Sequence, residues 1–186
     1  MIQFKIQGTP NPRARKYITD QILKGEGKIS YKDPQECLHV PLAKELLEII
    51  GVNQVHLFDS TLTITQDGSI DWADLDQVIQ DIVMEHMASH DPDFQETVDS
   101  ESEATSKKEL TGDLLLIDQI LETSIRPALQ MDGGDIEVVE LEDNVVTLKY
   151  MGACGGCPSS YTGTLEAIRL TLREEFRQDL EVVTIE

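Results

Sequence analysis

The stretch Ile136-Glu-Val-Val-Glu-Leu-Glu-Asp-Asn-Val-Val-Thr-Leu-Lys-Tyr-Met-Gly-Ala-Cys-Gly-Gly-Cys-Pro-Ser159 decides how the second half of the chain folds. Two apolar runs, residues 136–141 and 145–150, flank the turn residues Glu142-Asp143-Asn144, a pattern typical of an antiparallel β-hairpin. The hairpin leads directly into a loop that contains Cys154 and Cys157. The predicted hairpin therefore positions the loop that carries the two cysteines.

Helical patterns flank the hairpin on both sides. From about Gly112, apolar residues recur at i, i+3 and i+4 as far as Ile125, where Arg126-Pro127 kinks or restarts the helix. After the cysteines, residues 165–176 keep one apolar helical face, and residues 180–185 predict a last strand. The element order of this part is therefore α-β-β-α-β.

The N-terminal part also mixes strands and helices. A strand is predicted up to Gly8, followed by a turn at Thr9-Pro-Asn-Pro. Helical spacing over residues 41–50 predicts a short helix, and alternation on either side of Asp59-Ser60 predicts a hairpin. A helix that starts near Asp71 carries the last apolar stripe.

An acidic segment separates the two parts. Residues 91–109 contain 7 acidic and 2 basic side chains and no apolar period, which predicts a flexible linker. We therefore expect an α+β protein of two small mixed α/β domains, residues 1–90 and 110–186, joined by this linker. Hydrophobic residues make up 40% of the chain but aromatic residues only 5%, so the cores should be mainly aliphatic.

The net charge of −20 narrows the class of partner. Nucleic acids and anionic membranes bind clusters of basic residues, so we expect protein partners, with no nucleic acid and no membrane. No apolar stretch approaches the roughly 18 residues of a membrane span. The first residues read as a strand rather than a targeting segment. The expected location is cytoplasmic, as in a bacterial-type protein.

Cys154 and Cys157 are the candidate metal ligands. Two intervening residues let both sulfur atoms reach one metal, and Gly155 and Gly156 allow a tight turn with amide groups near the sulfurs. A helix expected just after Pro158 would place its positive end near the thiolates. Spacing alone leaves three interpretations open: an iron-sulfur cluster, a structural zinc site, or a dithiol that cycles with a disulfide.

Counting ligands separates these interpretations in part. Structural zinc takes four protein ligands, and the third cysteine, Cys37, lies in the other domain. A thioredoxin-like dithiol belongs to a βαβ context, whereas a hairpin precedes this loop, so redox exchange ranks second. An iron-sulfur cluster usually has about four cysteine ligands, and two identical chains supply four. We therefore predict a cluster shared across a homodimer.

The C-terminal part resembles a known family. Ile125-Arg-Pro-Ala-Leu-Gln-Met-Asp-Gly-Gly-Asp, the hairpin, and Gly152-Ala-Cys-Gly-Gly-Cys-Pro-Ser-Ser resemble the C-terminal domain of NifU-like (Nfu-type) iron-sulfur proteins. In the N-terminal part, Thr9-Pro-Asn-Pro, Pro41-Leu-Ala, Gly51-Val52 and Asp71-Trp72 are similar to the N-terminal domain of many Nfu proteins. The resemblance implies a carrier or scaffold rather than an enzyme. It would hold a 4Fe-4S cluster between two chains through Cys154 and Cys157, receive it from an upstream assembly scaffold, and deliver it to apo-proteins.

Three other residues of the N-terminal part could bind metal, but a structural role is expected for each. Cys37 is predicted to be a small, partly buried side chain and is not assigned to the cluster. His86 and His90 are four residues apart, a spacing that can bind metal. No third ligand stands beside them in a recognised pattern, so a solvated helix end is the expectation.

Three charged residues near the predicted turn at residues 132–135 invite a functional interpretation. Asp132 and Asp135 flank two glycines, and we expect them to shape the backbone rather than to act as a catalytic pair. Arg126 is a secondary candidate for positioning the cysteine loop, with a packed or exposed arginine as the default.

Overall fold

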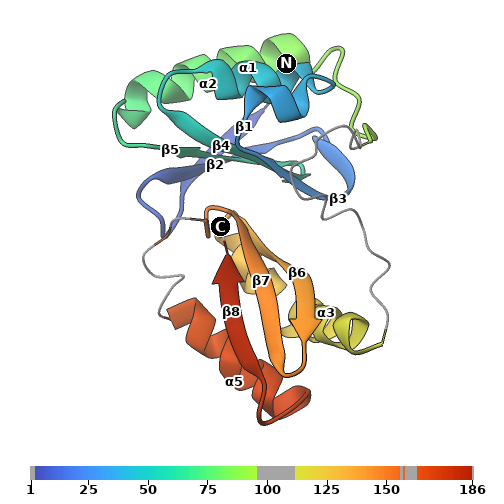
Figure 1. The fold of residues 1–186 in the computed structure, drawn as a ribbon. Coiled ribbons are helices and arrows are strands. Elements are labelled where there is room, and N and C mark those ends of the chain that lie inside the picture. Colours follow the sequence, from blue (N-terminus) through green and yellow to red (C-terminus); the bar gives the residue numbers. More distant parts are fainter. Residues whose placement is uncertain (1–2, 96–111, 156, 158–162, 186) are drawn as a thin grey trace. The chain divides into compact units, whose positions relative to one another are not determined.

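The computed structural model describes residues 3–95, 112–155, 157 and 163–185 (Figure 1). The chain divides into two compact units, residues 1–100 and 101–186. Each unit combines helices with its own β-sheet, which confirms the predicted α+β fold class.

The N-terminal unit is built on a five-stranded sheet of order β1-β2-β5-β4-β3, in which neighbouring strands are antiparallel. The strands are β1 (Phe4–Gly8), β2 (Ala14–Thr19), β3 (Lys24–Tyr31), β4 (Val52–Asp59) and β5 (Thr61–Gln66). The predicted hairpin around Asp59-Ser60 is confirmed, since Leu57 pairs with Leu62 and Phe58 with Thr61.

Two helices and a short 3₁₀ turn complete this unit: η1 (Pro34–Cys37), α1 (Pro41–Glu48) and α2 (Trp72–His86). Pro41 occupies the first turn of α1, where its missing N–H costs nothing. Both helices cover one face of the sheet (Figure 1). On α2, the predicted apolar stripe is the buried face, with Leu75, Ile79 and Val83 at most 2% exposed.

The strands β2 and β3 were not predicted from the sequence. Four of the six residues of β2 are buried, and these include the neighbours Lys16 and Tyr17, which point to opposite faces of the sheet. The sequence of β2 therefore shows no alternation of apolar and polar residues. In β3, two glycines and a register shift between Lys24 and Lys28 hide the period of two.

Residues 91–95, which we expected to belong to the linker, pack on the N-terminal unit. Phe94 is 8% exposed and belongs to its core. The Gly25 amide donates a hydrogen bond of 2.9 Å to the Pro92 carbonyl, and Lys24 Nζ lies 4.7 Å from the centre of the Phe94 ring. The rest of the predicted linker, residues 96–109, lies outside the described residues.

The C-terminal unit contains a three-stranded sheet of order β6-β7-β8. Its elements are α3 (Asp113–Ser124), α4 (Arg126–Met131), β6 (Gly134–Glu142), β7 (Val145–Gly152), α5 (Leu165–Glu175) and β8 (Glu181–Ile185). The strands β6 and β7 form the predicted antiparallel hairpin, while β8 pairs with β7 in parallel. The predicted break at Arg126-Pro127 restarts the helix, since α3 ends at Ser124 and α4 begins at Arg126.

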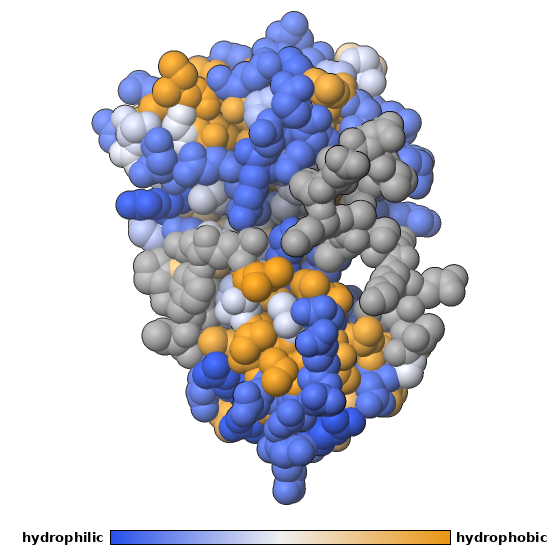
Figure 2. Space-filling view, viewed as in Figure 1, coloured by the Kyte–Doolittle hydropathy of each residue, from blue (hydrophilic) through white to orange (hydrophobic). Residues whose placement is uncertain are grey.

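The two faces of this second sheet differ. One face packs against α3 and α5 around a mainly aliphatic core in which Ile117, Leu148 and Ile168 are fully buried. Apolar side chains also gather on the surface of this unit that faces the viewer in Figure 2. In β8, Val183 and Ile185 are each 43% exposed.

Candidate metal centre

The cysteine loop begins where β7 ends. The first residue of β6, Gly134, pairs with the last residue of β7, Gly152, so the loop starts at the open end of the hairpin, opposite its turn. Its backbone then folds in consecutive tight turns. The Cys154 amide donates to the Met151 carbonyl at 3.3 Å, and the Cys157 amide donates to the Cys154 carbonyl at 3.3 Å. These turns keep the backbone between the two cysteines compact.

Amide groups of the loop donate to backbone carbonyl groups, and their proximity to the sulfurs stays a prediction. The amides of Cys154 and Cys157 donate to carbonyl groups, and the Gly155 amide donates to the Gly152 carbonyl at 3.1 Å. The described helix α5 begins at Leu165. Gly156 and residues 158–162 lie outside the described residues, so the predicted helix start after Pro158 is not tested.

Both cysteines are buried within the chain. Cys154 is 5% exposed and Cys157 is 3% exposed, and Cys154 belongs to the core of the C-terminal unit. All three cysteines are free thiols. The burial of Cys154 has a local cause, because the turn at residues 132–135 closes on the loop. The Ala153 amide donates to the Gly133 carbonyl at 3.0 Å.

An ionic network lies behind this turn, centred on the buried side chain of Arg126. Arg126 is 6% exposed; its Nε donates to the Ile136 carbonyl at 3.1 Å, and its Nη1 donates to Glu122 at 2.7 Å. Its Nη2 bonds Asp118, and Nε lies 3.6 Å from Asp135. Burial alone would lower the pKa of Arg126, but the hydrogen bonds to Asp118 and Glu122 raise it above its ordinary value. The arginine is therefore a charged anchor beneath the turn.

The two aspartates of the turn lie in different environments. Asp135 is fully buried, accepts a hydrogen bond from the Ile136 amide at 2.6 Å, and accepts another from Gln130 Nε2 at 3.0 Å. Asp132 is exposed, and its amide ends α4 by donating to the Ala128 and Leu129 carbonyls. These contacts support the expectation that both residues shape the backbone.

Cys37 lies apart from this site, in the core of the N-terminal unit. The side chain is fully buried and donates weakly to the Asp33 and Pro34 carbonyls. Burial, and then the charges of Glu36 and Asp33, raise the pKa of the Cys37 thiol to about 11. This environment suits a packed neutral thiol rather than a metal ligand.

The histidines at the end of α2 bond separate partners. His86 Nε2 lies 2.6 Å from Glu45 Oε2, while His90 Nε2 donates to the Leu23 carbonyl at 2.7 Å. The helix ends at His86, so the two rings do not share a helical face. Within residues 3–95, 112–155, 157 and 163–185, no three His, Cys, Asp or Glu side chains are grouped to hold a metal ion.

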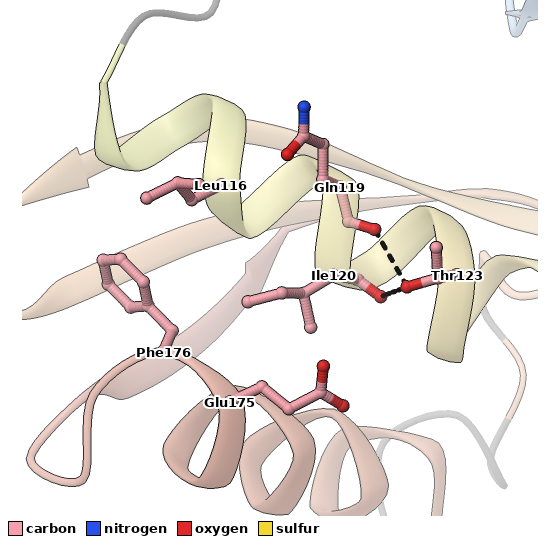
Figure 3. Close-up of a pocket in the computed structure, with 6 residues that line it drawn as sticks. All are labelled: Leu116, Gln119, Ile120, Thr123, Glu175 and Phe176. Atoms are coloured by element: carbon pink, nitrogen blue, oxygen red, sulfur yellow. Dashed lines mark hydrogen bonds between the residues drawn. The ribbon is translucent and has the colours of Figure 1, made fainter.

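A hollow lies between α3 and α5 in the C-terminal unit (Figure 3). It measures about 320 Å³ and is lined by Leu116, Gln119, Ile120, Thr123, Glu175 and Phe176. The Thr123 hydroxyl donates to the carbonyls of Gln119 and Ile120 within its own helix. Glu175 is the one ionisable group in this lining, so the hollow lacks the paired acid and base of a hydrolytic site.

No described helix combines the length and apolar character needed to cross a bilayer.

The class that the structure defines is a protein of two small α/β units, the second with a paired-cysteine loop after a β-hairpin. Residues 2–90 match the model of the family described as "Scaffold protein Nfu/NifU N terminal", and residues 117–183 match that of the "NifU-like domain". The chain belongs to the Nfu group of NifU-like proteins, as its motifs predicted.

Two curated relatives illustrate this family. "NifU-like protein 4, mitochondrial" of Arabidopsis thaliana is 34% identical over 84% of this chain, and human "NFU1 iron-sulfur cluster scaffold homolog, mitochondrial" is 33% identical over 84%. The chain spans 56% and 61% of the length of these relatives. A solution NMR structure of a NifU-like protein from Saccharomyces cerevisiae is 29% identical, covers 47% of this chain and 80% of its own, and has a TM-score of 0.43.

These relatives correct one prediction. We expected a cytoplasmic, bacterial-type protein, but the plant and human relatives are both named mitochondrial, and this finding contradicts the expectation. The expectation was wrong because it depended on seeing no targeting segment.

Proposed function

We propose that this protein is a non-enzymatic carrier of a 4Fe-4S cluster, which two chains hold through Cys154 and Cys157 and then deliver to apo-proteins. The observation that carries the proposal is the placement of both cysteines in one tightly turned loop after β7. Membership in the NifU-like family and the name "iron-sulfur cluster scaffold" of the human relative support it. The cluster is the cargo of the protein.

The donor chemistry fits this cargo. Thiolates are soft ligands, and iron-sulfur clusters are usually held by about four of them. Each chain contains three cysteines, and Cys37 is fully buried in the other unit with a raised thiol pKa. Two cysteines per chain therefore remain for the cluster, and a second copy related by two-fold symmetry completes the set of four.

Burial of the thiols shapes how loading and release work. In the cluster-free chain, Cys154 and Cys157 are at most 5% exposed, so loading requires the loop to turn both sulfur atoms outward. Each chain then contributes two iron–sulfur bonds, and closing the loop again favours release. Delivery to an apo-protein then leaves both thiols in their buried positions.

The first test compares variants prepared without air. Iron and sulfide analysis with Mössbauer spectroscopy is made on the wild type, Cys157→Ser, and the matched control Cys37→Ala. We expect brown wild-type protein that absorbs near 400 nm, with about four iron atoms per two chains. Cys157→Ser should lose this iron, and Cys37→Ala should keep it.

Size-exclusion chromatography of the same samples tests the shared site, since loaded wild type should elute as a dimer. Equal iron contents in the wild type and Cys157→Ser would show that Cys157 is not a cluster ligand. A monomer that holds a full cluster would contradict the model in which two chains share it. A colourless protein that reduces disulfides would identify a dithiol enzyme, and a colourless one that unfolds with a chelator would identify a zinc module.

A further inference from the structure

Gly134 faces Cys154 at a distance that leaves no room for a side chain. A Cβ atom added to Gly134 would overlap Cys154 Sγ, and it would lie 2.8 Å from the Cys154 amide nitrogen and 3.0 Å from the Cys154 Cβ. Protein interiors are close-packed, and real Cβ atoms essentially never lie within 3.0 Å of such neighbours. The absent side chain of Gly134 therefore forms a recess, and the Cys154 thiol fills it.

Backbone hydrogen bonds hold both sides of this contact in place, so moving the Cys154 thiol outward requires the loop to shift. Gly134 pairs with Gly152 at the end of the hairpin, and the Ala153 amide donates to the Gly133 carbonyl at 3.0 Å. The next residue, Asp135, is fully buried, and Arg126 Nε bonds the Ile136 carbonyl at 3.1 Å. Two of the three crowded atoms are the Cys154 amide nitrogen and Cβ, which shift only with the backbone.

We propose that Gly134 is a positioning residue for Cys154, whose thiol it houses in the cluster-free chain and shields from solvent and electrophiles. This inference deepens the proposed function, because a shielded ligand thiol stays reduced until a cluster arrives. It also stands without the cluster, because it concerns the metal-free chain, in which Cys154 is 5% exposed.

Alkylation of the reduced, metal-free chain tests the proposal. Wild type, Gly134→Ala and the control Gly163→Ala are treated with iodoacetamide, and mass spectrometry follows each cysteine separately. Gly163 lies in the same unit and has no atom within 4 Å of an added Cβ. In Gly134→Ala, we expect Cys154 to react about tenfold faster or more, because overpacking of this size raises the population of the displaced state. Cys37 should react at one rate in all three proteins.

Two outcomes would contradict the proposal that Gly134 positions and shields the Cys154 thiol. One is an unchanged Cys154 rate in folded Gly134→Ala. The other is an equal increase in Gly163→Ala. If Gly134→Ala folds poorly, urea unfolding followed by circular dichroism is compared in two backgrounds, wild type and Cys154→Ala. Removing the sulfur relieves the overlap, so Gly134→Ala should lower the midpoint less in the Cys154→Ala background. An equal loss in both backgrounds contradicts the proposal.

The two proposals fail separately. If the chain binds no iron but Gly134→Ala still speeds alkylation of Cys154, the carrier function is rejected and the positioning role of Gly134 is supported. If the chain loads iron but Gly134→Ala leaves that rate unchanged, the carrier function is supported and the positioning role is rejected.

Discussion

At the scale of single residues, the three cysteines occupy two kinds of environment. The sequence predicted which two belong together, because Cys154 and Cys157 are separated by two residues in a glycine-rich loop. It did not predict that both are buried. Burial of Cys154 depends on the backbone at Gly133 and Gly134, about twenty residues earlier in the chain, and local spacing carries no information about that approach.

The raised pKa of Cys37 gives a prediction about pH. A thiol whose pKa is raised to about 11 keeps its proton to higher pH than an ordinary thiol near 8.5, and the thiolate is the reactive form. We expect alkylation of Cys37 to be slow at pH 8 and to accelerate continuously as the pH rises toward 11. The measurement is the labelling rate of the Cys37 peptide from pH 7 to pH 10.5, with glutathione as the reference. A rate for Cys37 that levels off near pH 9, as for glutathione, contradicts this environment.

At the scale of elements, the sequence predicted the two apolar helix faces and the hairpins more readily than their connections. The break at Arg126-Pro127 was predicted from the proline alone. The ionic network there was not, because Arg126 meets Asp118 eight residues before it and Asp135 nine residues after it. Only the folded contact between α3, α4 and β6 brings these groups together.

Removing the charge of Arg126 should destabilise the C-terminal unit. In Arg126→Met the shape is roughly kept, but Asp118 and Asp135 lose their shared cation. Breaking such a buried pair costs about 3–5 kcal/mol of unfolding free energy. The measurement is urea unfolding followed by far-UV circular dichroism.

The fluorescence of Trp72, the one tryptophan of the chain, reports the N-terminal unit in the same samples and should not change. The matched control is Arg169→Met. Arg169 is half-buried, lies 3.9 Å from the exposed Glu166 and donates to the Val182 carbonyl at 3.2 Å, and exposed ion pairs of this kind contribute about 0–1 kcal/mol. Equal losses of unfolding free energy for Arg126→Met and Arg169→Met would show that the Arg126 network stabilises the unit no more than the Arg169 contacts do.

At the scale of the whole molecule, the sequence predicted two units from the loss of any apolar period after residue 90, and the chain does divide into two. The exact end of the first unit could not be found in this way. Phe94 stands alone among polar residues, so no period reveals that it belongs to the core, where its ring meets those of His39 and His90 edge-on.

This boundary predicts how fragments behave. A fragment of residues 1–95 should unfold in the same cooperative transition that Trp72 reports in the full chain. A fragment of residues 1–90 should be less stable by about 3–5 kcal/mol, because losing Phe94 resembles truncating a buried phenylalanine. Full-length Phe94→Ala is the matched variant and should reproduce most of the loss. Identical stability of the two fragments would show that residues 91–95 only rest on the surface.

The parallel pairing of β7 with β8 constrains the connection that contains the cysteine loop. Because Val145 pairs with Glu181, this connection leaves β7 at Gly152 and crosses back along the sheet to begin β8 beside the start of β7. The cysteine loop and α5 both belong to this crossover, so the loop is a segment fixed at both ends rather than a free arm. The entropy cost of fixing those ends is met when the unit folds. Under the proposed carrier function, that cost is not met again each time a cluster is taken up or given away.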